Sequence, residues 1–179
     1  MDFDDTPDQD AFRAECLVWL DAHASRRPEG AAEMWRGLRP RSEDEDAAAL
    51  ALAKTWQALK ADEGYTGIQW PVADGGRGLS PRHAAIFKDC EAKFDVPANA
   101  FQVAVDMVGP TLIAHGTEAQ RQRHLGPIRR GDEVWCQLFS EPGAGSDLAS
   151  LSTRAERDGD EYVVNGQKVW TSGAHQSDW

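Results

Sequence analysis

The hydrophobic pattern of this chain changes its period near Gly131, and that change limits the folds that it can adopt. Before Gly131 the apolar residues recur every three or four positions, which is typical of amphipathic helices. After Gly131 short strand-like runs alternate with turn-rich segments, which is typical of antiparallel sheets. We therefore predict an α+β fold, with an α-helical N-terminal domain over residues 1–132 and the start of an antiparallel, barrel-like β domain over residues 133–179.

The first two helices are predicted from one apolar face and one capping pattern. Residues 9–24 place apolar side chains on a single face at helical spacing. A second helix is expected from Ser42 to Gly64, because Ser42 and Glu45 form a capping box that satisfies free backbone N–H groups of the first turn. Residues 25–41 are rich in Arg, Pro and Gly, and they predict a loop or linker.

Residues 64–81 interrupt this pattern with five glycines and two prolines, and they predict a shaped loop rather than a regular element. Helical spacing returns over residues 86–94 and again over residues 101–112. Pro110 is expected to kink or to bound the later helix, because proline lacks the backbone N–H.

A second capping box, formed by Thr117 and Gln120, predicts the start of a further short helix. This helix is expected to end near Gly126-Pro127, since both residues disfavour its continuation. The first two-thirds of the chain is therefore predicted to be helical.

The β domain is predicted to contain about four strands, over residues 134–140, 151–156, 162–164 and 167–172. An Asp158-Gly159-Asp160 turn separates the second strand from the third. Asn165-Gly166 predicts a hairpin, because both central residues of a type I′ turn need a positive φ. So small a sheet leaves an open edge, which is a liability unless another segment pairs with it. We therefore expect the β domain to be incomplete at Trp179.

Composition excludes several classes of function. The formal net charge of -11 argues against a nucleic-acid partner, which would require a basic face. Three isolated cysteines and five scattered histidines show no metal-ligand spacing, and the cysteine usage fits a reduced, cytoplasmic protein. The acidic N-terminus lacks a secretory pattern, and no apolar run is long enough for a membrane span.

Two segments, 138–147 and 166–173, carry the residues most suited to chemistry. Each combines glycines with small hydroxyl side chains at the end of a predicted strand, where backbone N–H groups can face a ligand. Trp170 adds a flat apolar face that suits an aromatic ring system. The alternative is a simple turn with Trp170 in the core, and composition alone favours that alternative.

The combination of the two segments resembles the signature of the acyl-CoA dehydrogenases. The first reads Ser140-Glu-Pro-Gly-Ala-Gly-Ser-Asp147, and the second reads Asn165-Gly-Gln-Lys-Val-Trp170 with Ser172 close behind. In the N-terminal half, residues 67–79 and 116–131 also resemble the family. The resemblance covers nearly all of the chain from the second helix onward.

This resemblance implies a helical N-terminal domain, a middle β domain and a C-terminal four-helix domain, the last of which is absent from this chain. It implies FAD as the cofactor, held between the β domain and the C-terminal helices and reaching a neighbouring subunit. The positions that match flavin contacts are Gln137, Phe139, Ser140, Trp170 and Ser172. Ser146 matches a position near the acyl-CoA thioester, with a capping turn as the alternative role of Ser146 and Asp147.

The reaction implied is α,β-dehydrogenation of an acyl-CoA thioester. In the family a glutamate of the C-terminal domain usually removes the α-proton, so we predict no catalytic residue here, and we do not assign that role to Glu141. The resemblance also implies an electron-transfer flavoprotein as acceptor and a homo- or hetero-oligomer. Two alternatives stay open: a non-catalytic, partner-dependent subunit, and a flavin monooxygenase of the same fold.

Overall fold

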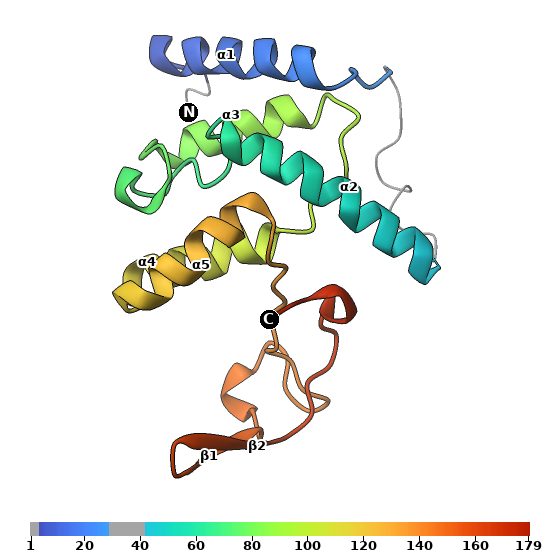
Figure 1. Cartoon of the computed structure of the whole chain (residues 1–179), viewed down its shortest axis with the longest axis vertical. Coiled ribbons are helices and arrows are strands. Elements are labelled where there is room, and N and C mark those ends of the chain that lie inside the picture. Colours follow the sequence, from blue (N-terminus) through green and yellow to red (C-terminus); the bar gives the residue numbers. More distant parts are fainter. Residues whose placement is uncertain (1–3, 29–41) are drawn as a thin grey trace. The chain divides into compact units, whose positions relative to one another are not determined.

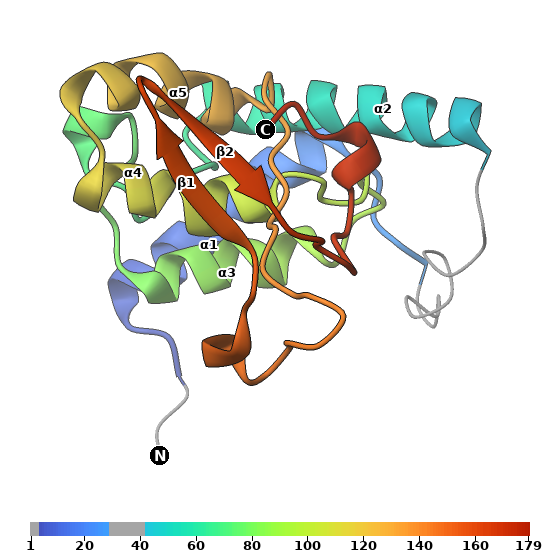
Figure 2. The ribbon, with the colours of Figure 1, turned by 90° about the horizontal axis from the view of Figure 1, so that it is seen from below.

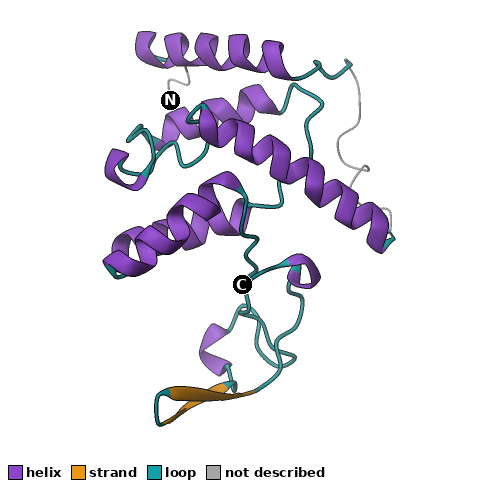
Figure 3. Ribbon diagram, viewed as in Figure 1, coloured by secondary structure: helices purple, strands orange, loops and turns teal. Residues whose placement is uncertain are grey.

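The computed structural model describes residues 4–28 and 42–179, and the chain divides into two compact units, Met1–Glu133 and Val134–Trp179 (Figure 1). Figure 3 shows that the described part of the first unit consists of helices and loops, and that the strands belong to the second unit. The helices of the first unit are α1 (Pro7–His23), α2 (Glu43–Asp62), η2 (Val72–Asp74), α3 (Pro81–Glu91), the π-helical η3 (Ala104–Val108), α4 (Gly109–His115) and α5 (Glu118–Arg130).

The core of the first unit forms where α1 packs against α3 (Figure 1). The predicted apolar face of α1 is confirmed, since Phe12, Cys16 and Leu20 are all buried. Aromatic rings fill most of the remaining space, and Tyr65 stacks on Phe87 with ring centroids 4.8 Å apart. The buried cluster comprises Phe12, Cys16, Trp19, Leu20, Trp56, Tyr65, Ile68, Ile86, Phe87, Cys90 and Phe94.

Both predicted capping boxes are present. At the start of α2, the backbone N–H of Glu45 donates to Ser42 Oγ over 3.2 Å, and the backbone N–H of Ser42 donates to Glu45 Oε2 over 3.0 Å. The start of α5 repeats the arrangement with Thr117 and Gln120. A third box at Thr6, before α1, was not predicted.

The predicted end of α5 is wrong. The helix passes Gly126-Pro127 and continues to Arg130, and the left-handed Gly131 (φ 76°) ends it. Pro127 removes one backbone donor, but the buried side chain of Ile128 holds the last turn against the core. Pro110 behaves as predicted and bounds a helix, because it lies in the first turn of α4, directly after the π-helical turn.

The loop regions of the first unit agree with the prediction where they are described. In residues 64–81 four glycines adopt positive φ, and this backbone holds the Trp70 side chain in the interior. Within the predicted linker, residues 25–28 lie beside the end of α3, and the N–H of Arg27 donates to the Lys93 carbonyl over 2.9 Å. The rest of that linker, residues 29–41, lies outside the described residues.

The second unit contains two of the four predicted strands. These are β1 (Arg154–Asp158) and β2 (Glu161–Asn165), an antiparallel hairpin that turns at Gly159-Asp160, as predicted (Figure 2). Two short 3₁₀ turns, η4 (Leu148–Ser150) and η5 (Ala174–Gln176), complete the unit. Every residue of both strands is exposed, so the hairpin has no buried face within the described residues.

The strands predicted over residues 134–140 and 167–172 are not formed. Each segment makes single backbone hydrogen bonds rather than a ladder; the N–H of Val169, for example, donates to the Ser140 carbonyl over 3.0 Å. The Asn165-Gly166 hairpin is also wrong, since neither residue has a positive φ. A glycine is required at 166 for a different reason: a Cβ there would overlap the side chain of Thr153.

None of the helices in the described part of the chain combines the length and the apolar character needed to cross a bilayer.

Candidate functional site

The Glu141 carboxylate organises the second unit. Its side chain is only 4% exposed, and it accepts hydrogen bonds from the backbone N–H groups of Ser152 (2.7 Å) and Thr153 (3.0 Å) and from the Ser152 hydroxyl (2.9 Å). The Lys168 ammonium lies 2.8 Å from the same carboxylate and forms an ion pair with it. A buried carboxylate with this many donors is fully satisfied, so it serves as an anchor for three segments of chain.

The ion pair joins the two segments singled out in the sequence. Lys168 also donates to the Phe139 carbonyl over 2.9 Å, and the Val169 N–H bonds the Ser140 carbonyl beside it. The backbone at Phe139 and Ser140 is therefore held against the backbone that leads into Trp170. We call this arrangement, formed by Glu141, Lys168, Ser152 and Thr153, the Glu141 clamp.

Electrostatics keep Glu141 ionised. The Lys168 ammonium, followed by the donors of Thr153 and Ser152, holds the pKa of Glu141 far below its usual range. A carboxylate whose lone pairs are occupied and whose pKa is depressed is a poor acceptor for a substrate proton. Its geometry therefore supports an anchoring role rather than a role as a base.

Trp170 has an unusual backbone conformation and an exposed side chain, and packing within the second unit explains neither feature. It is the only described non-glycine residue with a positive φ (55°), and its side chain is 81% exposed. A bulky residue in the left-handed region is strained, and such strain is commonly found at ligand sites. The predicted alternative, a Trp170 buried in the core of a sheet, does not apply within the described residues.

The other predicted positions lie as follows. Phe139 is 52% exposed, Ser140 and Gln137 are half-buried, and Ser172 is exposed. The structure brings Phe139 and Ser140 together with the segment that carries Trp170, while Gln137 precedes them and Ser172 follows Trp170 in the chain. Ser146 is exposed in the turn before η4, and it makes none of the hydrogen bonds of the Glu141 clamp.

The capping alternative for the side chains of Ser146 and Asp147 is not supported, because neither side chain makes a capping hydrogen bond. Asp147 stands at the cap of η4 without a side-chain capping bond, and its backbone carbonyl accepts from the Ser150 hydroxyl over 2.9 Å.

Sequence reasoning did not predict the Glu141–Lys168 pair. The signal was present, because the first glycine-rich segment carries the acidic residues Glu141 and Asp147 and the second carries the basic residue Lys168. Within the described residues, no cluster of His, Cys, Asp and Glu is arranged to hold a metal ion.

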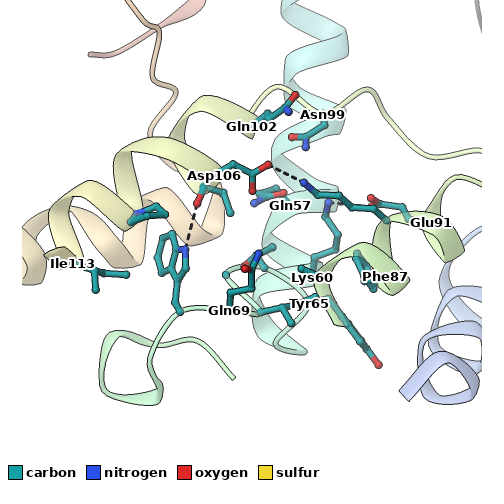
Figure 4. A pocket seen from close by; sticks show the side chains of 18 of the residues that line it. Gln57, Lys60, Tyr65, Gln69, Phe87, Glu91, Asn99, Gln102, Asp106 and Ile113 are labelled. Atoms are coloured by element: carbon teal, nitrogen blue, oxygen red, sulfur yellow. Dashed lines mark hydrogen bonds and ion pairs between the residues drawn. The ribbon is translucent and has the colours of Figure 1, made fainter. Parts of the chain in front are cut away.

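The first unit holds a cavity of about 610 Å³ that the sequence did not indicate. Side chains of α2, of the loop after it, of α3 and of the η3–α4 segment line this cavity, and Figure 4 shows them converging on it. Two ion pairs lie along its wall, Lys60–Glu91 at 3.0 Å and Lys88–Asp106 at 2.8 Å.

Comparison with known proteins identifies the class of this fold. The family model for the N-terminal domain of acyl-CoA dehydrogenases matches residues 6–132, and that for the middle domain matches residues 136–179. The chain belongs to the acyl-CoA dehydrogenase family.

Particular relatives agree with this assignment. The chain is 43% identical to acyl-CoA dehydrogenase IpdE1 of Mycobacterium tuberculosis over 172 residues, which cover 96% of this chain and 43% of the relative. It is 37% identical to mitochondrial isobutyryl-CoA dehydrogenase of Dictyostelium discoideum over 66% of this chain and 28% of that protein. The chain thus spans less than half the length of these curated relatives.

Among solved structures, the ChsE4-ChsE5 complex from Mycobacterium tuberculosis contains a chain that matches with a TM-score of 0.75 and 33% identity. The match covers 99% of this chain and 42% of that one. A structure named as a steroid ACAD, Tcur3481-Tcur3483, matches with a TM-score of 0.71 and the same identity, over 99% of this chain and 43% of its own.

The residues of the second unit fit a flavin. A planar, partly apolar ring system with hydrogen-bonding edges requires exposed aromatic faces beside small donors. Trp170 and Phe139 supply exposed aromatic faces, and Ser140 and Ser172 supply hydroxyls on the same two segments.

Proposed function

We propose that this chain is part of an FAD-dependent acyl-CoA dehydrogenase that introduces an α,β double bond into an acyl-CoA thioester. The observation that carries the proposal is the Glu141 clamp, which joins the two candidate flavin segments and leaves the side chains of Phe139 and Trp170 open. When bound, FAD supplies the acceptor for the hydride that leaves the β-carbon.

The roles of individual residues follow from their chemistry. Trp170 and Phe139 would hold the flavin through their aromatic side chains, and the Ser140 and Ser172 hydroxyls would hydrogen-bond its polar groups. Gln137 lines the same site, and Ser146 lies near the thioester end of the acyl-CoA. Because the Glu141 clamp fixes the backbone of both segments, these groups are positioned before the cofactor arrives.

A base must remove the α-proton, and Glu141 does not serve as that base. Its four donors and its low pKa keep this carboxylate occupied. We propose that the base lies outside these 179 residues, and that the chain alone binds FAD weakly and does not dehydrogenate acyl-CoA. We further propose that an electron-transfer flavoprotein accepts the electrons. We also propose that the protein assembles into an oligomer and that it is located in the cytoplasm.

The test is an anaerobic titration of the native polypeptide that carries this sequence, purified from its source cells. Addition of an acyl-CoA should bleach the oxidised flavin absorbance and yield one 2-enoyl-CoA per flavin. Absence of flavin, or flavin that no acyl-CoA reduces, would contradict the proposal and favour a partner-dependent, non-catalytic subunit. Product that carries an oxygen atom from O₂ would favour the monooxygenase alternative.

A further inference from the structure

Three side chains at the N-terminal ends of α1 and α3 form a hydrogen-bonded triad that the proposed dehydrogenation does not use. The hydroxyl oxygen of Ser80 lies 2.8 Å from Nδ1 of His83, and Nε2 of the same imidazole lies 3.0 Å from a carboxylate oxygen of Asp8. Asp8 lies in the first turn of α1, which packs against α3 (Figure 1). A serine, a histidine and a carboxylate in this order form the arrangement that activates a serine hydroxyl as a nucleophile.

The contact with Asp8 fixes which nitrogen of His83 can act as a base. A carboxylate accepts but does not donate hydrogen bonds, so Nε2 carries the ring hydrogen and donates it to Asp8. In the neutral imidazole Nδ1 therefore has a lone pair, and the Ser80 hydroxyl donates to it. His83 is only 7% exposed, and the ring of Phe12 packs against it edge-on with centroids 5.0 Å apart. The imidazole is thus held in one orientation between the other two groups.

The Ser80 hydroxyl is not used to cap its helix. Thr6, Ser42 and Thr117 occupy the same position before α1, α2 and α5, and each of their side chains accepts a hydrogen bond from the backbone of the first turn. Ser80 makes no such bond, although it precedes α3 at the same position. Its hydroxyl is bonded to His83 instead, and the residue is exposed, so an electrophile in solution can reach Oγ.

The surroundings of Ser80 limit which electrophile can react there. The positive end of the α3 dipole would stabilise negative charge on a carbonyl oxygen beside Ser80, because this residue stands directly before the first turn. The side chain of Asp8 is 84% exposed, and Asp10 in the same turn is also exposed. Arg82, in the first turn of α3, pairs with Asp5 over 2.6 Å. The two exposed carboxylates would repel an anionic substrate but not a small uncharged ester.

We propose that Ser80, His83 and Asp8 form a hydrolytic site that cleaves small uncharged carboxylic esters, an activity separate from the proposed dehydrogenation. The Ser80 oxygen attacks the carbonyl carbon of the ester while Nδ1 of His83 takes the hydroxyl proton. The bond from that carbon to the alkoxy oxygen breaks, and the leaving oxygen takes the proton from His83. Water then attacks the acyl-serine by the same route, which releases the carboxylic acid and restores the Ser80 hydroxyl. Asp8 is a positioning residue, because it holds the ring through Nε2 and does not touch the ester.

The experiment measures hydrolysis of p-nitrophenyl acetate by the native polypeptide that carries this sequence, followed through the absorbance of the released p-nitrophenolate. Ser80→Ala and His83→Gln should each lower kcat/KM by about tenfold or more, because one removes the nucleophile and the other removes its base. Ser42→Ala, which removes the equivalent hydroxyl before α2, is the matched control and should keep the unmodified rate. Thermal unfolding of each variant verifies that it is folded.

A second measurement identifies the acylated residue directly. The reaction of the unmodified protein is stopped in acid, and peptide mass mapping should place an acetyl group on Ser80. Because this measurement needs no variant, it stands even if a substitution prevents folding.

Asp8→Asn tests the positioning role. The amide lacks the charge that stabilises the imidazolium formed in each step, so kcat should fall by about tenfold while KM stays within about twofold. Asp10→Asn removes the same charge from the same turn and should change neither constant.

Rates for Ser80→Ala and His83→Gln equal to that of the unmodified protein would overturn the proposal, and so would an acetyl group found only on other residues. An unchanged kcat in folded Asp8→Asn would overturn the role of Asp8. Because none of these readouts involves flavin or acyl-CoA, failure here is distinct from failure of the proposed dehydrogenation.

Discussion

The Glu141 carboxylate and the Lys168 ammonium, 27 residues apart in the chain, lie 2.8 Å from each other. Through Lys168 the pair reaches the Phe139 carbonyl, and through Glu141 it reaches the backbone N–H groups that lead into β1. One ion pair therefore determines how two glycine-rich segments with little regular structure lie against each other.

Glu141→Gln should loosen the Glu141 clamp. An amide NH₂, which cannot accept a hydrogen bond, would replace one carboxylate oxygen that faces several N–H and O–H donors. Lys168 would also lose its counter-charge. Hydrogen exchange should show faster exchange of the Val169 N–H, which bonds the Ser140 carbonyl. Glu161→Gln on the exposed strand β2 is the matched control, and it should leave that exchange rate unchanged. Unaltered Val169 protection in Glu141→Gln would contradict the anchoring role.

The stability of the second unit should fall in acid. Because the pKa of Glu141 is lower in the folded chain than its usual value of 4.5, the unfolded chain binds more protons as the pH falls. The stability contributed by Glu141 is complete above about pH 4.5, and it is lost as the pH falls below that value toward the depressed pKa. Exchange measured from pH 6 to pH 3 should show this loss in the unmodified chain, and Glu141→Gln should show a smaller dependence.

Trp170→Ala should separate ligand binding from folding. Because the side chain is exposed, its removal should change the free energy of unfolding by no more than about 0.5 kcal/mol. The affinity of the native polypeptide that carries this sequence for FAD, measured by quenching of flavin fluorescence, should fall roughly tenfold or more, since one aromatic face is lost. Tyr162→Ala, another exposed aromatic in the same unit, should leave FAD affinity unchanged. Equal FAD affinity for Trp170→Ala and the unmodified chain would refute the flavin assignment of Trp170.

Gly109→Ala should destabilise the first unit. A Cβ at this position would overlap the buried indole of Trp70, whose N–H bonds the Val105 carbonyl over 3.3 Å. Such overpacking costs about 1–3 kcal/mol and should lower the thermal unfolding midpoint. Gly126→Ala is the control, because its Cβ would meet no atom and alanine favours the helix. A midpoint for Gly109→Ala equal to that of the control would contradict this packing.

The helical half of the fold was predictable because its signals are local. The side chains of the capping residues Ser42 and Thr117 bond backbone N–H groups within the next turn. The apolar spacing of α1 indicates which face of that helix is buried. The end of α5 was not predictable in this way. Burial of Ile128 against other helices outweighs the local preference of Gly126-Pro127 to end the helix.

The β half was predicted less well because strands depend on partners that are distant in sequence. Only the hairpin of β1 and β2, which closes on itself through Gly159-Asp160, formed as expected. Residues 134–140 and 167–172 have strand-like composition, but among the described residues they meet through single hydrogen bonds. The local composition of such a segment does not determine how many backbone hydrogen bonds it forms with other segments in the folded chain.

By itself, the sequence determined the main helices, the caps at Ser42 and Thr117, and the two segments that carry the family signature. Each of these depends on residues close together in the chain. Only the tertiary structure decided that Glu141 pairs with Lys168, that Trp170 is exposed in a strained backbone, and that Lys60 and Gln57 face a cavity. These features depend on burial and on contacts between segments far apart in sequence, which no local pattern encodes.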